Sequence, residues 1–566
     1  MGNKKYSIGI DFGTLSGRSL LVDVATGEEI ASAVLDYPHA VMDEYLVYAE
    51  GKNPISLPPD WALEHPRDYL DVLAVTVPEV LKKAGVSADD VIGVGVDFTA
   101  CTLMPVHKDG TPLCFDEKYI ANPHAYIKLW KHHAAQSHAN RINKAAEDMG
   151  EEWLANYGGK ISSEWLFPKL WQTLEEAPEI YENAAFFIEA ADWVIWQMTG
   201  VQTRNSCTAG YKAMFNKKNG YPSKMFFKAL DPKLENVVAD KLDCPISPLG
   251  SRAGGISKAG AALTGLKEGT AVAVANVDAH VTVPALGMDG AGKMLAIMGT
   301  STCHMILGTE EKVVPGMCGV VADGILPGFF GYEAGQSCVG DHFAWFVDNY
   351  TPYEYKVEAK ERGISAMKLM VEKASKLKPG ESGIIALDWW NGNRSVLVDV
   401  DLSGIFIGMN LLTKPEELFR ALIEATAFGT KKIIDTFRDN GVEVNDFYAA
   451  GGIAEKDPFT MQIYSDVTGM EIKISGSPQA PALGSAIFGA AAAGKSAGGY
   501  TDVFEASRSM GKLSEKIYRP NPENTKTYAT LYDEYETLHD YFGRGENNIM
   551  KRLRKLRAEV KGNAGL

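Results

Sequence analysis

The pattern of apolar and polar positions predicts a strand–turn–strand unit that occurs twice. Residues 6–11 and 19–24 are strand-like, and a turn rich in glycine, threonine and serine separates them. Buried strands are predicted again at residues 293–298 and 303–307, around the small-residue turn 299–302. The same hairpin arrangement in both halves of the chain indicates a topological repeat.

Helical periodicity and short buried strands alternate along the rest of the chain. Helices are predicted at residues 66–84, 125–150, 166–182, 416–440, 458–468, 482–493 and along most of 523–560. Further strands are predicted at residues 91–97, 271–277 and 446–450, and residues 186–199 form a shorter apolar segment. Strands that alternate with helices indicate an α/β protein. Residues 205–251, rich in Lys, Asn and Pro, are interpreted as insertions on its core.

Composition and charge limit the class of protein. The 566 residues are 46% hydrophobic and 23% charged, which is ordinary globular composition. The formal charge of −16 disfavours nucleic acid and anionic membranes as partners. No secretory signal and no apolar stretch of about 18 residues is found, so we expect a soluble cytoplasmic protein. The seven scattered cysteines, never spaced CxxC, are interpreted as reduced thiols.

The first turn carries groups that bind phosphate. Its glycines let backbone amides approach phosphate oxygens, and its hydroxyl groups donate hydrogen bonds. Arg18 adds a cation, and Asp11 can hold magnesium directly or through water. A plain hairpin with a solvent-facing arginine is the alternative interpretation.

Two later turns are candidates for the nucleotide. Turn 299–302 and the first turn could hold a polyphosphate between two lobes. Gly451 and Gly452 lie between a strand and a helix, where α/β sheets bind ligands. A helix cap or a tight turn explains these glycines equally well.

Two strand ends carry carboxylates. Asp278 follows an apolar strand and could accept a proton from a hydroxyl as a general base, or it could cap a helix. Asp97 and Thr99 end another strand, where they could contact a substrate or cap the next element.

Two further patterns are rejected. Residues 489–496 match the P-loop expression GxxxxGK[ST], but they close an alanine-rich helix, whereas a P-loop opens one. His132, His133 and His138 lack the i, i+4 spacing of a metal pair and are interpreted as surface residues.

In combination, these segments resemble the FGGY carbohydrate kinases of the actin, hexokinase and heat-shock chaperone superfamily. The resemblance is carried by IGIDFGTLSGR, VANVDAHVTVPALG, MLAIMGTSTCHMIL, LFRALIEATAFGTKKIID, AAGGIAEKDPFTMQIYSDVTG and APALGSAIFGAAAAG, within residues 8–494. It implies an α/β fold of two ribonuclease-H-like (actin-like ATPase) lobes around a central cleft. We expect an N-terminal lobe at residues 1–287 with the sugar site, and a nucleotide-binding lobe with a helical tail at residues 288–566.

The resemblance also implies roles for individual residues. Asp278 is expected to be the general base, and Asp11 the carboxylate associated with Mg²⁺. The expected ATP positions are Asp11, Thr14, Ser16, Arg18, Thr300, Gly340, Gly451 and Gly452. The expected sugar positions are Ala100, Trp130, Lys212 and Glu333.

Within the family, the segments VDFTACT, AYIKLWKHHAAQ, GYKAMF and GYEAGQSCVGDHFAWF look like those of the members that phosphorylate L-ribulose. The resemblance implies MgATP-dependent formation of L-ribulose 5-phosphate in arabinose use. Two alternatives stay open: a kinase of another ketopentose or a polyol, and an actin-like ATP switch protein. The oligomeric state is also open, with a homodimer as one candidate.

Overall fold

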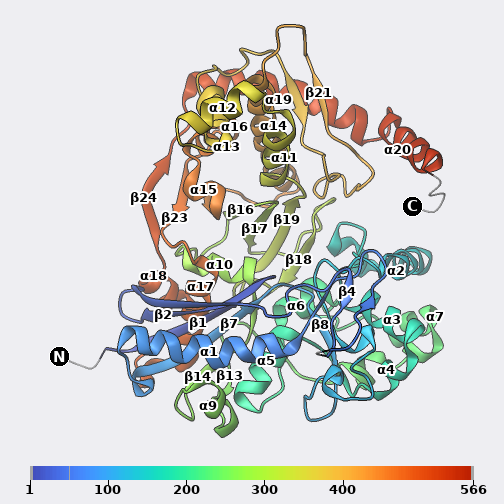
Figure 1. The fold of residues 1–566 in the computed structure, drawn as a ribbon, viewed down its shortest axis with the longest axis vertical. Helices are drawn as coiled ribbons and strands as arrows, with labels where there is room; N and C mark the ends of the chain where they lie inside the picture. The colour runs from blue at the N-terminus through green and yellow to red at the C-terminus, as the bar shows by residue number, and fades with distance from the viewer. Residues whose placement is uncertain (1–3, 50, 562–566) are drawn as a thin grey trace.

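Two seven-stranded sheets organise the chain in the computed structural model, which describes residues 4–49 and 51–561 (Figure 1). The first sheet has the order β13–β14–β7–β1–β2–β3, and β15 also pairs with β7. The second has the order β18–β19–β17–β16–β22–β23–β24. The predicted α/β class with two sheet-rich lobes is confirmed.

Both sheets are built around the same hairpin. The strands of the first are β1 (Tyr6–Phe12), β2 (Ser16–Asp23), β3 (Glu29–Asp36), β7 (Val91–Phe98), β13 (Arg252–Gly255), β14 (Ala271–Ala273) and β15 (Asn276–Val277). Those of the second are β16 (Lys293–Met298), β17 (Thr302–Gly308), β18 (Gly319–Ala322), β19 (Phe330–Gln336), β22 (Asp446–Ala450), β23 (Ile472–Ser475) and β24 (Leu513–Tyr518). Strands β1 and β16 each pair antiparallel with the next strand and parallel with a later one. The predicted repeat is confirmed.

Helices cover both sheets. Those that pack on or between the sheets include α1 (Pro66–Ala84), α10 (Asp278–Ala285), α14 (Pro415–Asp439), α16 (Pro458–Thr468) and α17 (Ala480–Ala493). Helix α1 has the bounds that the periodicity predicts, because Pro66 starts it and Gly85, with a left-handed φ of 66°, ends it. Helix α10 contacts both β7 and β17, so this helix lies between the two sheets (Figure 1).

Helix α17 follows the second sheet in sequence but packs on the first. A Cβ atom added at Gly9 would lie 1.7 Å from the Ala482 carbonyl oxygen, and one at Gly95 would lie 1.9 Å from that of Ser485. Only glycine permits this close approach of a helix to strands β1 and β7. The C-terminal half of the chain therefore contributes to the first sheet's core, and the boundary at residues 287/288 stays a prediction.

Three predicted segments differ from the structure. Residues 125–150 are not one helix, because their first part forms β9 (Ile127–Lys128), which pairs with neighbouring strands, and only α2 (Gln136–Met149) is helical. Residues 166–182 divide into α3 (Leu166–Glu176) and α4 (Pro178–Asn183), since Pro178 lacks the N–H that would continue the helix. The apolar segment 186–199 is β10 (Phe186–Glu189) followed by α5 (Ala190–Thr199).

The remaining elements decorate this framework. The short strands are β4 (Tyr45–Leu46), β5 (Ile55–Ser56), β6 (Leu63–Glu64), β8 (Leu103–Val106), β11 (Arg204–Asn205), β12 (Ile246–Ser247), β20 (Ile385–Leu387) and β21 (Ile405–Ile407). The further helices are α6 (Ser206–Lys212), α7 (Lys224–Leu230), α8 (Val237–Lys241), α9 (Lys258–Thr264), α11 (Gly340–Tyr350), α12 (Tyr353–Glu361), α13 (Ala366–Ala374), α15 (Gly452–Lys456), α18 (Val503–Met510), α19 (Pro522–Gly543) and α20 (Ile549–Val560).

The rejection of the P-loop pattern is confirmed, but the interpretation of two histidines as surface residues is wrong. Helix α17 ends at Ala493, and Gly494 follows with a φ of 73°, so residues 489–496 close a helix and form no P-loop. His132 and His138, interpreted as surface residues, are buried against α3. Their ring nitrogens lie 2.9 Å from Gln172 Oε1 and Glu175 Oε2, so hydrogen bonds compensate for their burial. Within the described residues, no helix is long and apolar enough to span a membrane.

Candidate active site

The β1–β2 turn is a closed loop with charged residues at its base. The Gly13 amide donates to the Ser16 carbonyl oxygen at 3.0 Å, and the Tyr37 hydroxyl donates to the Gly13 carbonyl oxygen at 2.9 Å. Below the turn, Arg18 Nε lies 3.3 Å from Asp11 Oδ2, because the strand register places these residues opposite each other. Thr14, Ser16 and Arg18 each keep part of their surface exposed.

Three aspartates end three neighbouring parallel strands of the first sheet. Asp11 on β1 is in register with Asp97 on β7, and Asp278 comes directly after β15, which also pairs with β7. Asp97 is fully buried; its Oδ2 accepts a hydrogen bond from Ser485 on α17 at 2.6 Å. The Asp97 Oδ1 atom has no hydrogen-bond partner in the described part of the chain.

The crowding of these carboxyl groups changes their protonation. Burial and then the charge of Asp11 raise the pKa of Asp278 to about 7. Burial and the same neighbour raise the pKa of Asp97 well above its usual range. Burial also raises the pKa of Asp11, and Arg18 offsets this only in part. The site is therefore short of positive charge, and a bound cation or a proton would stabilise it.

The donor set fits Mg²⁺ only in part. Carboxylate oxygens are the ligands that Mg²⁺ prefers, and the unpaired, buried Asp97 oxygen needs a positive partner. Over residues 4–49 and 51–561, however, no three His, Cys, Asp or Glu side chains are close enough to hold a metal ion by themselves. This suits a cation held by one or two carboxylates, water and phosphate oxygens.

A cluster of opposite charges lies between the two lobes. Lys212, at the end of α6, donates to both carboxylate oxygens of Glu333 on β19, at 3.4 and 3.3 Å. Arg394 Nη2 donates to Glu333 Oε1 at 2.8 Å, and His280 Nε2 lies 3.6 Å from Glu333 Oε2. Burial favours the neutral acid, but Lys212 and Arg394 outweigh it and hold the pKa of Glu333 at about 2.

This charged cluster and the aspartates belong to one site. His280 is two residues after Asp278 on α10, and the charges of Glu333 and Lys212 contribute to the pKa of Asp278. The structure thus brings the predicted base together with the predicted sugar residues Lys212 and Glu333.

The other two predicted sugar residues lie on loops of the first lobe. Trp130 is 38% exposed, and its Nε1 donates to Thr14 Oγ1 in the β1–β2 turn at 3.1 Å. Ala100 is half-buried and precedes Cys101, which has a left-handed φ of 61°. Trp130 therefore connects the predicted sugar residues with the phosphate turn.

The predicted nucleotide residues of the second lobe gather around the β16–β17 turn. The Gly340 amide, at the start of α11, donates to the Gly299 carbonyl oxygen at 3.0 Å, and the Val339 amide donates to that of Thr300 at 2.8 Å. Thr300 itself is exposed. A Cβ atom at Gly340 would lie 2.6 Å from the Gly299 carbonyl oxygen. This close packing explains why glycine occupies that position.

The two glycines after β22 differ in their surroundings. Gly451 has a φ of 94°, and a Cβ atom there would lie 2.6 Å from the Met298 carbonyl oxygen. Gly452 is exposed, and a Cβ atom there would contact nothing within 4 Å. Gly451 is thus required by the backbone, whereas Gly452 leaves open space at the start of α15.

Sequence reasoning missed two residues of this site and the position of a third. Asp97 was named as a possible substrate contact, but its place beside Asp11 was not predicted, because their register appears only in the folded sheet. His280 stands in the segment that carries Asp278, and that proximity was the available signal. Arg394 lies between β20 and β21 in a stretch without periodicity, so no sequence signal pointed to it.

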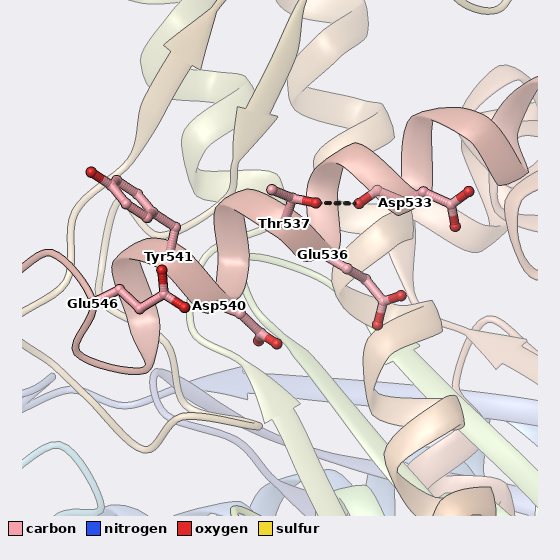
Figure 2. A pocket seen from close by; sticks show the side chains of 6 residues that line it. All are labelled: Asp533, Glu536, Thr537, Asp540, Tyr541 and Glu546. Carbon is pink, nitrogen blue, oxygen red and sulfur yellow. Dashed lines mark hydrogen bonds between the residues drawn. The ribbon is translucent and has the colours of Figure 1, made fainter.

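A separate pocket of about 450 Å³ lies along α19 (Figure 2). The six side chains that line it are Asp533, Glu536, Thr537, Asp540, Tyr541 and Glu546. None of them is a predicted site residue, and four are acidic. An acidic pocket is poorly suited to the phosphate groups of a nucleotide.

Comparisons with known proteins identify the family of this chain. The profiles of the FGGY family of carbohydrate kinases match residues 6–285 with the N-terminal domain and residues 294–493 with the C-terminal domain. A ribulokinase from Bacillus licheniformis is 60% identical over 96% of this chain and 98% of its own. A ribulokinase from Geobacillus thermodenitrificans is 58% identical over 97% of both chains.

Solved structures share the fold at low sequence identity. The ligand-bound xylulose kinase of Lactobacillus acidophilus superposes with a TM-score of 0.76 at 17% identity, over 96% of this chain and 99% of its own. The xylulose kinase of Rhodospirillum rubrum gives a TM-score of 0.74 at 19% identity, over 94% of this chain and 98% of its own.

Proposed function

We propose, because this chain belongs to the FGGY family of carbohydrate kinases, that it transfers the γ-phosphoryl group of ATP to the terminal hydroxyl of L-ribulose. The products are L-ribulose 5-phosphate and ADP. The observation that carries the proposal is the position of Asp278. This carboxyl group stands beside two further aspartates and near the buried Lys212–Glu333 pair.

Asp278 serves as the general base. Its carboxylate takes the proton from the sugar hydroxyl while the oxygen attacks the γ-phosphorus, and the bond to the leaving ADP oxygen breaks. A pKa of about 7 suits this role, because the group is ionised in a useful fraction at neutral pH and still holds a proton well.

Four residues orient the sugar: Ala100, Trp130, Lys212 and Glu333. The Lys212 ammonium donates to a hydroxyl or carbonyl oxygen, and Glu333, held ionised by Lys212 and Arg394, accepts hydrogen bonds from hydroxyls. Trp130 offers an apolar wall to the carbon chain beside Ala100.

The two hairpin turns and the glycines hold ATP. Thr14, Ser16, Arg18 and Thr300 bind phosphate oxygens, and Gly340, Gly451 and Gly452 leave room for the nucleotide. Asp11 and Asp97 are the carboxylates that would hold Mg²⁺. Mg²⁺, when bound, neutralises charge on the phosphates.

The wider setting is proposed with the activity. We place the enzyme in the cytoplasm, in L-arabinose use, because its seven cysteines are free thiols and its proposed substrates are ATP and a pentulose. We divide it at residues 287/288 and retain a homodimer as a candidate assembly. A switch protein would not need the buried sugar cluster, and no observation favours one.

A coupled ADP-release assay with MgATP tests the proposal. L-ribulose, D-ribulose, L-xylulose, D-xylulose and glycerol are compared by kcat/KM. The highest value is expected for L-ribulose. A higher value for another sugar would reassign the substrate within the family. If none of the five compounds stimulates ADP release, the kinase activity is refuted.

A further inference from the structure

The two loops that carry Ala100 and Trp130 meet at one buried ammonium group. Lys169 on α3 is fully buried, and its Nζ donates to the carbonyl oxygen of Cys101 at 2.6 Å and to that of Leu129 at 2.7 Å. A third carbonyl oxygen, that of Lys128, lies 3.3 Å away. Cys101 directly follows Ala100, and Leu129 directly precedes Trp130.

Each of the three hydrogens of the Lys169 ammonium group has an acceptor. An ammonium group has three hydrogens and no lone pair, so three carbonyl acceptors match it fully. A charged side chain is rarely buried unless its hydrogen bonds are satisfied, because desolvation is costly. Lys169 thus adds a side-chain connection between two loops that are about 30 residues apart in sequence and that the pairing of β8 with β9 brings close together.

The backbone conformation at Cys101, whose carbonyl oxygen Lys169 contacts, is strained. Cys101 has a φ of 61°, a conformation that is unfavourable for a non-glycine residue and persists only where the surroundings enforce it. The hydrogen bond from Lys169 to the Cys101 carbonyl oxygen is one such enforcing contact. Trp130, one residue beyond Leu129, reaches Thr14 of the phosphate turn.

Trp165, four residues before Lys169, also borders the sugar cluster. The ring centroid of Trp165, just before α3, lies 5.8 Å from Lys212 Nζ. The start of α3 therefore faces the site, and Lys169 lies one turn further along.

We propose that Lys169 is a positioning residue that sets the spacing between the Ala100 and Trp130 walls of the sugar pocket. It touches no substrate and acts through main-chain carbonyl groups. The kinetic test of this inference rests on the proposed function, whereas its test by hydrogen exchange does not.

The test compares Lys169→Met with Lys241→Met. Lys241, the last residue of α8, also donates to two main-chain carbonyl oxygens, those of Tyr181 and Ala184 at 2.7 Å, but neither belongs to the sugar loops. For Lys169→Met we expect the KM for L-ribulose to rise about 10- to 100-fold, with the KM for ATP within about twofold of wild type. For Lys241→Met we expect the sugar KM to stay close to wild type, and the Tm of both variants is measured alongside.

Hydrogen exchange gives a second readout that needs no turnover. In Lys169→Met, peptides covering residues 99–103 and 127–131 should exchange faster than in wild type, and α1 should be unchanged. If Lys169→Met does not fold, Lys169→Gln, which keeps a shorter donor, takes its place and should show the same changes to a lesser degree.

The outcomes separate the two proposals. An unchanged sugar KM in the Lys169 variant, or an equal rise in Lys241→Met, overturns the positioning role while the kinase proposal stands. A wild type that turns over no sugar overturns the kinase proposal, and the exchange of the two loops then decides the role of Lys169.

Discussion

The two sheets share one hairpin but differ in what occupies its base. In the first sheet, Asp11 on β1 is opposite Arg18 on β2 and in register with Asp97 on β7. At the corresponding places of the second sheet stand Ile297, Cys303 and Ala450. The carboxylates that raise one another's pKa are thus concentrated at the end of the first sheet. The second sheet contributes Glu333 to the sugar cluster, and it offers backbone groups and glycines around its own turn.

This difference teaches how one topology is divided between two tasks. Proton transfer and cation binding require carboxylates. Neighbouring buried carboxylates raise one another's pKa, so a cation or a proton must compensate their charge. Holding a nucleotide requires close backbone approach, which glycine permits. We therefore expect changes at the base of the first hairpin to affect chemistry, changes in the Lys212–Glu333 cluster to affect sugar binding, and changes around the second hairpin turn to affect ATP binding.

The largest effect is expected at the predicted base. Asp278→Asn should lower kcat by about 10²- to 10⁴-fold, because the amide cannot accept the sugar proton. Sugar affinity, measured by calorimetry, should remain within a few-fold. Asp289→Asn, which breaks surface ion pairs with Lys293 and Arg508, is the matched control and should leave kcat unchanged. Near-normal turnover by Asp278→Asn would rule out its role as base.

The next effect is expected on sugar binding. Lys212→Met should raise the KM for L-ribulose roughly 10- to 150-fold, the range for loss of a charged hydrogen bond, and leave the KM for ATP unchanged. Lys217→Met is the control, because Lys217 also pairs across the lobes, with Asp323, but outside this cluster. Equal changes in both KM values would contradict the division of tasks.

A smaller effect, on the nucleotide, is expected in the second lobe. Gly451→Ala should raise the KM for ATP roughly tenfold, since the added Cβ collides with the Met298 carbonyl oxygen and the φ of 94° is strained for alanine at ~1–3 kcal/mol. Gly452→Ala meets open space and should change it little. Steady-state kinetics in both substrates separates these variants. A larger effect of Gly452→Ala would indicate that ATP itself fills that space.

The smallest effect is a pH dependence. The base must be ionised, and the pKa of Asp278 is raised to about 7, so kcat/KM for the sugar should fall as pH decreases through 7. Between pH 7.5 and 6.5 a single group of this pKa predicts a decrease of about threefold. A profile that is flat over this range would mean that another group accepts the proton.

Regular elements with strong periodicity were predictable from sequence, and irregular ones were not. Strands β16 and β22 and helices α1 and α16 have the predicted bounds, because hydrophobic pattern, proline and glycine agree there. The prediction of one helix over residues 125–150 was wrong, because β9 is stabilised by pairing with β6 and β8 and the local pattern does not reveal this pairing. The side-chain assignments at the site remain predictions, although the structure brings Asp278, Lys212 and Glu333 together.

By itself, the sequence determined the α/β class, the two hairpins, the family resemblance and the candidate residues. These features depend on local periodicity, on glycine at turns and on short motifs, and all of them are encoded within a few neighbouring residues. Only the tertiary structure decided that Asp97 stands beside Asp11, that Arg394 completes the Glu333 cluster and that Lys169 joins two sugar loops. Each of these contacts depends on register and burial across distant segments, and their energies exist only once the chain has folded.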